Sequence, residues 1–377
     1  MKKADREKKL LMCASRSSHL TGFHTPWLQW FSENGWQVFT AAQGEGTMWG
    51  EHLSLPFEKR LISLKNLGSL WKLTKFIRRE KFWLIVSHAS LASFLTRLAV
   101  VFSGDRQARL VQVCHGYLFR DDSSLKSRLY LFCESLFSGR IACLLVMNDE
   151  DEAIARKYSL CRKIVRISSM GLCPLSSPPK SREVLRRELD IDENSVCFLA
   201  VGEFSARKNQ ERLISAFEKV GERFPNTRLY FVGEGVLLEK CRQLAGKGKA
   251  AGQIVFLGHR KDIRHLLPAF DVLLTASKSE GLPFCVLEAL DAGLPVIASK
   301  IKGHRELVRH GENGLLFSLG DPAEPAKSME EWLLSPKSRW KKRDISAYRI
   351  SAVMKPVLDC YLGKDGEKHE DAFGQSL

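Results

Sequence analysis

Two glutamates, Glu280 and Glu288, are the residues of this sequence best suited to ligand chemistry. They belong to the stretch DVLLTASKSEGLPFCVLEALDAGLPVIAS (271–299), in which apolar residues of a predicted helix surround Glu288. A carboxylate in such surroundings is costly unless a polar group partners it. The partner could be a ligand, or the glutamate could cap a helix or form an ion pair within the fold.

The elements around these glutamates predict a position at the edge of a parallel sheet. The runs 272–276 and 295–298 are short and nearly uncharged, as is typical of strands covered on both faces. Between them, Pro283 suits the first turn of a helix and Gly293 the left-handed residue after its end. Because α/β proteins bind ligands where a strand is followed by a helix, we expect both glutamates to border a ligand site.

Arg207 and Lys208 form a second candidate site, after a strand predicted at 196–201. They stand directly before a helix that we expect to begin near Asn209. Two fixed cations beside a helix start suit a diphosphate, since the free amides and the helix dipole add to their charge. The alternative is a solvated pair of charges on a loop.

Weaker signals follow two other predicted strands of the second half. Gly233 and Gly235 would allow a ligand to approach the backbone closely. Arg260 follows the strand predicted at 254–257. Neither signal identifies a site by itself.

Two candidates lie in the first half of the chain. Gly22 falls in a loop expected after the first strand, where backbone amides could meet a phosphate. His115 follows the strand predicted at 110–113. A lone histidine at such a place could be structural, or it could face a cleft.

Strands and helices alternate through the second half of the chain. Apolar residues at helical spacing predict a helix over 209–224, and short apolar runs predict strands. This alternation indicates a doubly wound parallel sheet. The predicted strands are 196–201, 229–232, 254–257, 272–276 and 295–298, with further helices up to about Ala245 and over 262–270.

The first half shows the same alternation less clearly. The polar stretch SRSSHLTGF (15–23) is expected to be a loop before a helix at 25–33. Asn148 is expected to cap a later helix, with Asp151 three residues on. The Pro- and Ser-rich segment 173–181 is typical of a linker. The predicted strands are 10–14, 37–41, 84–87, 110–113 and 143–147.

The composition is that of a globular chain. Its 377 residues suffice for two domains, and 44% are hydrophobic and 27% charged. No apolar run approaches the roughly 20 residues that cross a bilayer. The apolar run near the N-terminus is too short for a signal peptide, so a solvated basic tail is expected. The ten cysteines show neither close pairs nor metal-ligand spacing, which indicates a reducing compartment and no structural zinc.

Positive charge is concentrated in the first half. Residues 1–175 hold 26 Lys and Arg against 15 Asp and Glu, a balance of +11 within a net charge of +15. The partner could be an anionic membrane, a phosphate-bearing acceptor or nucleic acid, and solubility alone is the plain alternative. The segments 125–140 and 71–81 mix basic and apolar residues, so each could rest on an anionic membrane or face the core.

Taken together, these motifs resemble the family 4 retaining glycosyltransferases of the GT-B fold. The resemblance is closest to the bacterial branch that builds capsular polysaccharide and exopolysaccharide, and it covers about 10–360. The last of the matching stretches is the most specific, because it carries the family's paired glutamates at Glu280 and Glu288. The stretches are SSHLTGFHTPWLQWFSENGWQV, VCHGYLF, LLVMNDEDEAIARKY, VGEFSARKNQERLISAF, FVGEG, FLGHRKDI and SEGLPFCVLEALDAGLPVIASKIKGHREL.

The resemblance implies an α/β fold of two Rossmann-like domains, each a doubly wound parallel sheet, facing a central cleft. The acceptor-side domain is expected over 1–175, with a last helix at about 340–362 crossing back to it. The nucleotide-sugar domain is expected over 176–339. A disordered tail is expected over 363–377.

The resemblance also implies residue roles. Glu288 would bind the ribose hydroxyls of the nucleotide. Glu280 and the backbone of Gly281, Leu282 and Pro283 would hold the donor sugar.

The remaining roles concern the diphosphate and the sugar hydroxyls. Arg207 and Lys208 would neutralise the diphosphate, whose charge grows as the sugar departs. Gly22 would belong to a glycine loop under the diphosphate, and His115 would contact the donor sugar. The other donor-binding residues expected are Gly233, Gly235 and Arg260.

The implied reaction moves a sugar, with retained anomeric configuration, from a nucleotide-diphosphate donor to a saccharide acceptor carried on a lipid. UDP is the nucleotide expected from its frequency in the family, and neither a metal nor a further cofactor is expected. In front-face attack the leaving phosphate accepts the acceptor's proton, so no protein nucleophile is required, although Glu280 could serve as one. The expected setting is the cytoplasm, with attachment to the inner face of the membrane left open, and no nucleic acid is expected as a partner.

The chain departs from the family pattern at two places. Many members carry Gly-Arg where this chain has Gly202-Glu203, which transfers the phosphate role onto Arg207 and Lys208. The segment SSMGLCP differs from the usual Gly-Val/Ile-Asp.

Two rival functions stay open at this stage. A nucleotide-sugar 2-epimerase shares the architecture and needs no acceptor, so the products formed from donor alone separate the two. A non-catalytic basic protein that binds membrane or nucleic acid would fit the charge. Against it, basic-aromatic nucleic-acid motifs are absent, and Glu280, Arg207 and Lys208 occur together.

Overall fold

The computed structural model contains two compact α/β units. It describes residues 6–58, 63–88, 90–117, 119 and 124–364. The chain up to Gly171, together with the part from Ile350 onward, forms unit 1. Leu172–Arg349 form unit 2. The sequence-based boundaries were 175/176 and about 339/340, so the first lies four residues earlier in the structure and the second about ten residues later.

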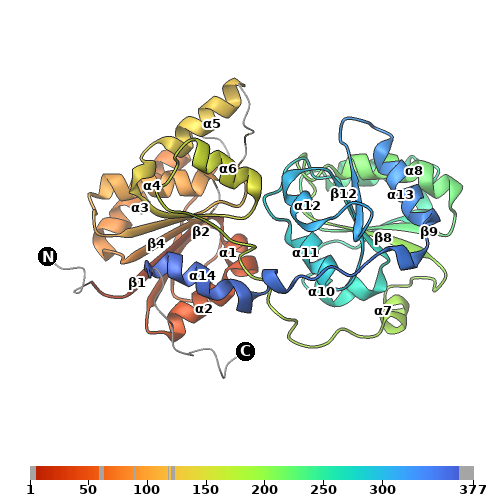
Figure 1. Cartoon of the computed structure of the whole chain (residues 1–377), viewed down its shortest axis with the longest axis horizontal. Coiled ribbons are helices and arrows are strands. Elements are labelled where there is room, and N and C mark those ends of the chain that lie inside the picture. Colours follow the sequence, from red (N-terminus) through yellow and green to blue (C-terminus); the bar gives the residue numbers. More distant parts are fainter. Residues whose placement is uncertain (1–5, 59–62, 89, 118, 120–123, 365–377) are drawn as a thin grey trace. The chain divides into compact units, whose positions relative to one another are not determined.

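Unit 1 is built on a parallel sheet of seven strands in the order β3-β2-β1-β4-β5-β6-β7 (Figure 1). Its central strand has no solvent-exposed residue from Leu10 to Ala14, because helices cover the sheet on both faces. The strands are β1 (Lys9–Arg16), β2 (Gln37–Gln43), β3 (Glu51–Ser54), β4 (Leu84–His88), β5 (Arg109–Val113), β6 (Ile141–Val146) and β7 (Ile164–Arg166).

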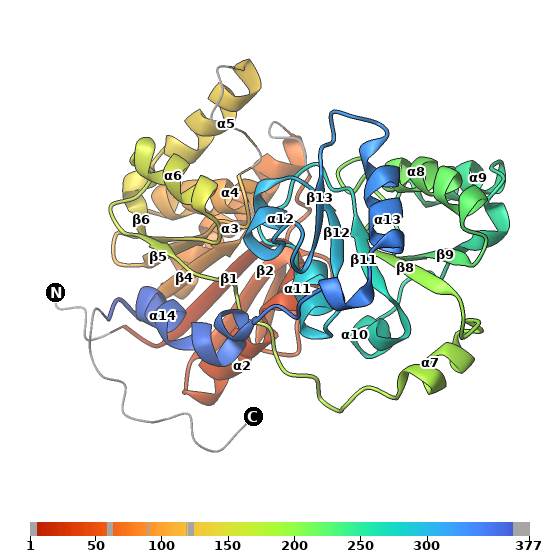
Figure 2. The same ribbon diagram turned by 45° about the vertical axis from the view of Figure 1, so that its right-hand side comes forward.

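Seven helices in the described part of unit 1 surround this sheet. They are α1 (Ser17–Phe23), α2 (Thr25–Glu33), α3 (Leu64–Glu80), α4 (Ser90–Ser103), α5 (Leu125–Ser135), α6 (Asp149–Lys157) and α14 (Ile350–Leu362). Helices α3 and α4 lie on one face of the sheet, and α2 and α14 lie on the other (Figures 1 and 2). Although α14 comes from the end of the chain, the Arg109 side chain joins it to β5 by donating to the carbonyls of Cys360 and Tyr361 at 2.8 and 2.9 Å.

Unit 2 contains a parallel sheet of six strands in the order β10-β9-β8-β11-β12-β13. These are β8 (Val196–Val201), β9 (Thr227–Val232), β10 (Ile254–Phe256), β11 (Val272–Thr275), β12 (Val296–Ser299) and β13 (Gly314–Phe317). The helices are α7 (Arg182–Glu188), α8 (Gln210–Arg223), α9 (Leu238–Gly246), α10 (Ile263–Leu266), α11 (Phe284–Asp291), α12 (Lys302–Leu307) and α13 (Glu324–Leu334). On one face of the sheet, Phe198 packs edge-on against Phe217 of α8 and Trp332 of α13.

Both units confirm the predicted fold class of two Rossmann-like parallel sheets. In unit 2, β8 lies between β9 and β11, so the loops that follow these three strands meet at one edge of the sheet. In unit 1, β1, β4 and β5 are neighbours in the same way. These two edges position every candidate site residue considered below.

Several local predictions are confirmed and others are wrong. The Asn148 side chain caps α6 by accepting a hydrogen bond from the Asp151 amide at 2.8 Å. Gly293 has the expected left-handed conformation, with φ of 82°. The stretch 15–23, predicted to be a loop, instead completes β1 and forms α1. The last helix begins at Ile350 rather than near 340, because short 3₁₀ turns occupy the preceding segment.

Edge strands and the chain end complete the comparison. The edge strands β3, β7 and β13 were not predicted. Strands β3 and β7 are only 4 and 3 residues long and half exposed, and β13 has only 4 residues. The predicted disordered tail falls, from residue 365 onward, outside the described residues. In the part of the chain that the structure describes, no helix has the length and apolar character needed to cross a bilayer.

Candidate active site

Backbone hydrogen bonds join the loops at the carboxyl edge of the unit 2 sheet. The Phe204 amide donates to the Glu234 carbonyl at 2.8 Å, which joins the loops after β8 and β9. The Lys278 amide donates to the Arg207 carbonyl at 2.8 Å, which joins the loops after β8 and β11. The second contact brings the predicted diphosphate loop against the loop that carries Glu280.

Glu280, Arg207 and Lys208 form one ion-pair cluster at this edge. Oε1 of Glu280 lies 2.6 Å from Nη1 of Arg207 and 2.8 Å from Nζ of Lys208. The side chains of Glu280 and Lys208 are each 12% exposed, whereas Arg207 is 42% exposed. Burial opposes ionisation of Glu280, but the positive charges of Lys208 and Arg207 outweigh it and lower the pKa of Glu280 to about 2. The cluster therefore holds two cations and one carboxylate at neutral pH.

Gly202 provides the space through which Lys208 reaches this position. Its φ is 150°, and a Cβ atom added there would lie 3.0 Å from Cε of Lys208. Asn209 then turns the chain into α8 with a left-handed φ of 59°, and its side-chain amide donates to the Ala276 carbonyl at 3.2 Å. Gly202 is the glycine that the chain shares with the family pattern, and only the next residue, Glu203, differs. This glycine thus has a packing role beside Lys208.

Glu288 has a weaker set of partners than Glu280. Its side chain is 21% exposed, and its ionic partner Arg264 is at 3.9 Å. Arg264 lies closer to Asp291, at 3.4 Å, and Asp291 also pairs with Arg349 at 2.7 Å. Burial raises the pKa of Glu288 to about 7; Arg264 opposes this increase and Asp291 adds to it. The sequence-based alternative, in which Glu288 is satisfied by a close ion pair in the fold, is therefore poorly supported by the geometry.

Cys285 lies within electrostatic reach of both glutamates. Burial raises the pKa of the Cys285 thiol, the positive charge of Lys208 lowers it, and the charges of Glu280 and Glu288 raise it. Glu280 and Glu288, eight positions apart in the sequence, thus border one region of unit 2.

His304 is a neighbour of this region that the sequence analysis did not single out. It is fully buried at the start of α12, and its Nδ1 donates to the Ser299 carbonyl at 2.7 Å. Burial lowers the pKa of His304 to about 4, while the Ser299 carbonyl and Glu280 oppose the shift and Lys208 adds to it. Nε2 of His304 is buried without a hydrogen-bond partner among the described residues. The signal in the sequence was its place in KGHREL (302–307), a few residues after the strand predicted at 295–298.

The loop Gly281, Leu282 and Pro283 connects Glu280 to α11. All three residues are buried, and Pro283 is the residue that precedes the first turn of the helix. A Cβ atom added at Gly303 would lie 2.7 Å from the Gly281 carbonyl oxygen and 2.8 Å from that of Glu280. The start of α12 therefore packs tightly under the loop and holds it in place.

Gly233 and Gly235 have a structural explanation that the sequence did not reveal. A Cβ atom at Gly233, where φ is 142°, would lie 2.1 Å from the Gly202 carbonyl oxygen. At Gly235, where φ is 151°, it would lie 2.4 Å from the Phe204 carbonyl oxygen. Both glycines therefore allow the loops after β8 and β9 to approach each other, whatever ligand they meet.

Arg260 is engaged locally. Its guanidinium donates two hydrogen bonds, of 2.8 and 2.7 Å, to the carboxylate of Asp262. These hydrogen bonds raise the pKa of Arg260 and lower that of Asp262. A ligand anion at this loop would have to share Arg260 with that carboxylate.

In unit 1, His115 lies among three other histidines. It follows β5, and its Nε2 is 3.4 Å from Nε2 of His19 and 3.1 Å from Nδ1 of His88, while His24 lies 3.3 Å from His19. Sequence reasoning considered His115 alone, although the other three also lie at or shortly after the ends of strands.

Gly22 belongs to α1 and not to a loop, and no atom lies within 4 Å of a Cβ atom added there.

Two family profiles match the chain. The profile "Glycosyl transferase 4-like domain" matches residues 27–168, and "Glycosyl transferases group 1" matches residues 181–347. The putative glycosyltransferase EpsD of Bacillus subtilis is 31% identical over 338 residues, which cover 87% of this chain and 88% of EpsD. The UDP-Gal:alpha-D-GlcNAc-diphosphoundecaprenol alpha-1,3-galactosyltransferase of Escherichia coli is 28% identical, with 70% and 69% of the two chains covered.

Solved structures share the fold over nearly the whole chain. HepE of Anabaena in complex with UDP and glucose aligns with a TM-score of 0.73 and 18% identity, covering 95% of this chain and all of HepE. A sucrose-phosphate synthase of Thermosynechococcus elongatus aligns with a TM-score of 0.76 and 18% identity, covering 94% and 98%. With the EpsD match and both domain profiles, the chain belongs to the family 4 glycosyltransferases of the GT-B fold.

Proposed function

We propose that this protein transfers a sugar from a UDP-sugar to a saccharide carried on a lipid diphosphate, with retention of the anomeric configuration. The observation that carries the proposal is the buried cluster of Glu280 with Arg207 and Lys208, next to Glu288, whose ionic partner Arg264 is 3.9 Å away. The donor nucleotide is supported by the UDP complex of HepE, and the lipid diphosphate by the diphosphoundecaprenol named for the Escherichia coli relative.

The donor diphosphate is assigned to Arg207 and Lys208. In the cluster these two cations share one carboxylate, so a net positive charge remains available to an anion. As the bond to the sugar breaks, negative charge grows on the leaving phosphate, and cations already in place stabilise that charge without reorganisation. Fixed side-chain charges thus do the work for which many transferases use a metal ion, so we propose a metal-independent transfer.

Glu288 is assigned to the ribose. An ionised carboxylate offers one acceptor oxygen to each of two neighbouring hydroxyls, whereas protonation turns one of these oxygens into an O–H donor. Because burial raises the pKa of Glu288 to about 7, the protein holds this group close to its titration point, and two hydroxyl donors would favour the ionised form.

Glu280 is assigned to the donor sugar, together with the backbone of Gly281, Leu282 and Pro283. A carboxylate whose pKa is lowered to about 2 by two cations is a weak base and a weak nucleophile. This favours front-face attack, in which the leaving phosphate takes the proton of the acceptor hydroxyl, over a covalent intermediate on Glu280. Gly22 and His115 keep the unit 1 roles proposed from the family, with Gly22 acting from α1.

The acceptor and the membrane are assigned to unit 1. The apolar residues Leu125, Leu129 and Phe132 of α5 are 83%, 53% and 61% exposed, so the alternative that they face the core is wrong. Exposed Lys126 and Arg128 lie on the same helix, which stands out from the rest of unit 1 (Figures 1 and 2). An apolar surface with cations beside it suits the inner face of an anionic membrane. We therefore propose a cytoplasmic protein held at that face while it builds surface polysaccharide.

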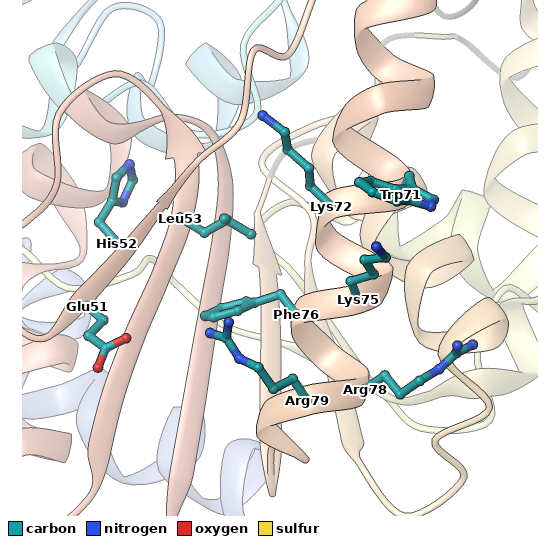
Figure 3. Close-up of a pocket in the computed structure, with 9 residues that line it drawn as sticks. All are labelled: Glu51, His52, Leu53, Trp71, Lys72, Lys75, Phe76, Arg78 and Arg79. Carbon is teal, nitrogen blue, oxygen red and sulfur yellow. The ribbon is translucent and has the colours of Figure 1, made fainter.

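A second basic surface of unit 1 supports this assignment. A groove of about 660 Å³ lies between β3 and α3, and Figure 3 shows the cations of α3 along it. Trp71 is 60% exposed, and the Lys75 ammonium lies over its ring at 3.7 Å from the centroid. The lining residues are Glu51, His52, Leu53, Trp71, Lys72, Lys75, Phe76, Arg78 and Arg79.

Donor binding is tested by thermal shift with UDP-, GDP- and ADP-sugars on the native chain and on Glu288→Ala, with and without EDTA. A ligand at 100 times its dissociation constant adds about 2.7 kcal/mol of stability, which is a measurable shift. We expect one UDP-sugar to stabilise the native chain in EDTA and to stabilise Glu288→Ala much less. Equal shifts in both proteins would contradict the nucleotide assignment.

Transfer itself is tested with the donor identified in that way. Products are analysed after incubation with donor alone and with a synthetic lipid-diphosphate saccharide. A new glycosidic bond of retained configuration, formed only with acceptor, is expected. Conversion of the donor sugar to its 2-epimer without acceptor would support the rival epimerase.

A further inference from the structure

Four histidines of unit 1 converge at the carboxyl ends of three neighbouring strands. His19 belongs to α1 after β1, His24 follows that helix, His88 ends β4 and His115 follows β5. One nitrogen of each ring faces the cluster, and these four atoms all lie within 4.8 Å of one another. His24 and His88 are fully buried, and the other two rings are partly exposed.

The contacts among the four rings cannot all be ordinary hydrogen bonds. Nε2 of His19 faces His24 at 3.3 Å and His115 at 3.4 Å, and Nε2 of His115 also faces Nδ1 of His88 at 3.1 Å. A ring nitrogen carries either one hydrogen or one lone pair. Two of these nitrogens each take part in two contacts, so at most two of the three contacts can be separate hydrogen bonds.

A metal ion held between the four rings would satisfy all four nitrogens at once. Bonds of about 2.0–2.1 Å from Zn²⁺ to imidazole nitrogens in a tetrahedron place the nitrogens roughly 3.3 Å apart. The three short separations of 3.1–3.4 Å match that spacing.

We propose that His19, His24, His88 and His115 bind one divalent transition-metal ion, with Zn²⁺ as the first candidate. Neutral imidazole ligands suit zinc, copper, nickel and iron rather than magnesium or calcium. Four protein ligands would close the coordination shell, as is typical of structural sites. The ion would hold α1 against the ends of β4 and β5.

The four histidines and the two cations assigned to the diphosphate belong to different units of the chain, and a metal ion on the histidines is compatible with the proposed transfer. Arg207 and Lys208, which are assigned to the diphosphate, belong to unit 2, so the diphosphate still needs no metal. An ion on Nε2 of His115 leaves the ring hydrogen on Nδ1, and metal-bound histidines usually donate that hydrogen to an oxygen. Under the proposed function, that oxygen would be a hydroxyl of the donor sugar. Metal binding itself does not depend on this role.

The test is metal binding by the full chain. The protein is stripped with a chelator and dialysed, and Zn²⁺ or Co²⁺ is then added while bound metal is measured by mass spectrometry. We expect one ion per chain, a visible absorption band of tetrahedral Co²⁺ that Zn²⁺ abolishes, and a higher Tm with metal. Less than a tenth of an ion per chain at micromolar free Zn²⁺ would overturn the proposal.

Variants locate the ion. His19→Gln and His115→Gln change the two partly exposed rings and should each weaken Zn²⁺ binding at least about tenfold. His52→Gln is the matched control, because His52 is a partly buried histidine of unit 1 bonded to Thr40 and outside the cluster. The His52→Gln variant should still bind one Zn²⁺ ion per chain. If the cluster variants bound Zn²⁺ as the native chain does, or if His52→Gln lost the ion equally, the assignment would be wrong. If a cluster variant fails to fold, the absorption band of Co²⁺ bound to the native chain still tests whether a tetrahedral metal site exists.

Discussion

Nζ of Lys208 and Oε1 of Glu280 lie 2.8 Å apart, and both side chains are almost buried. The pair joins the loop after β8 to the loop after β11, which lie 72 positions apart in the sequence but follow neighbouring strands. Burial lowers the pKa of Lys208, yet Cys285 and Glu280 raise it more, so the ammonium stays charged. A cation held in this way is ready to meet a diphosphate without first being ordered.

Replacement of Lys208 by alanine should reduce turnover more than folding. The variant removes one of two cations assigned to the departing phosphate, a loss expected to lower kcat by about 10²–10³-fold. Glu280 keeps Arg207 as its partner, so the buried carboxylate is not left unpaired. The measurement is kcat for the native chain and for Lys208→Ala, with the Tm of each.

Lys278→Ala is the control for charge alone. Lys278 lies two positions from Glu280 in the same loop, but its side chain is exposed and its contact with Arg207 is made by the backbone amide. Its kcat should stay close to that of the native chain. If the kcat of Lys208→Ala stayed within a factor of two of the native value, the assignment of Lys208 to the diphosphate would be wrong.

Glu288 should make donor affinity depend on pH. Its pKa of about 7 lies above the ordinary 4.5, so the fraction of ionised carboxylate rises between pH 6 and 8. Since the ionised form accepts the stronger, charge-assisted hydrogen bonds from the two ribose hydroxyls, the Kd for the UDP-sugar should fall over that range. A UDP-sugar suits the experiment because its diphosphate does not titrate there. Glu288→Gln should bind more weakly and lose the pH dependence, and an unchanged slope in that variant would contradict the assignment.

The raised pKa of Glu288 should also lower the stability of the unliganded protein as pH rises. A carboxyl whose folded pKa exceeds its unfolded value stabilises the fold below pH 4.5, and this contribution is lost as pH rises through 7. The loss is at most about 3 kcal/mol, because each tenfold change in proton affinity corresponds to about 1.4 kcal/mol. Urea unfolding at pH 5 and pH 8 should therefore differ more for the native chain than for Glu288→Gln. A difference of equal size in both proteins would show that other groups cause it.

The sequence predicted most of the second sheet, because its buried strands and its amphipathic helix α8 have clear periods. Helix α1 was missed because SRSSHLTGF is polar, contains a glycine and follows the strand without a linker. Glu280, Arg207 and Lys208 were singled out from the sequence as candidate site residues, but their ion pairs depend on β8 lying next to β11. Strand order cannot be read from a linear pattern. For the same reason the four histidines, which gather through the order β1, β4 and β5, gave no spacing signal.

The variant Gly233→Ala tests whether the glycines after β9 are required for the close approach of two backbone loops or only for ligand binding. Alanine there would force φ of 142° on a residue with a Cβ atom, 2.1 Å from the Gly202 carbonyl oxygen. We expect Gly233→Ala to lose about 2 kcal/mol or more of stability even without ligand. Gly246→Ala is the control, because a Cβ atom at that exposed end of α9 would meet nothing within 4 Å. If both variants unfolded at the same urea concentration as the native chain, the close approach of the two loops would not limit stability.

Helix α5 should hold the protein on anionic membranes. Leu129 and Phe132 are 53% and 61% exposed, and burying such side chains in a membrane contributes about 1.5–3 kcal/mol each. Leu129→Ser with Phe132→Ser should therefore reduce co-sedimentation with phosphatidylglycerol vesicles at least about tenfold while leaving the Tm unchanged. Leu334→Ser is the matched control, since Leu334 is 72% exposed in unit 2 and should not affect vesicle binding. Higher salt should weaken binding through Lys126 and Arg128. If the native chain bound neutral vesicles equally well, or if the α5 variant bound anionic vesicles as the native chain does, α5 would not be the membrane-binding surface.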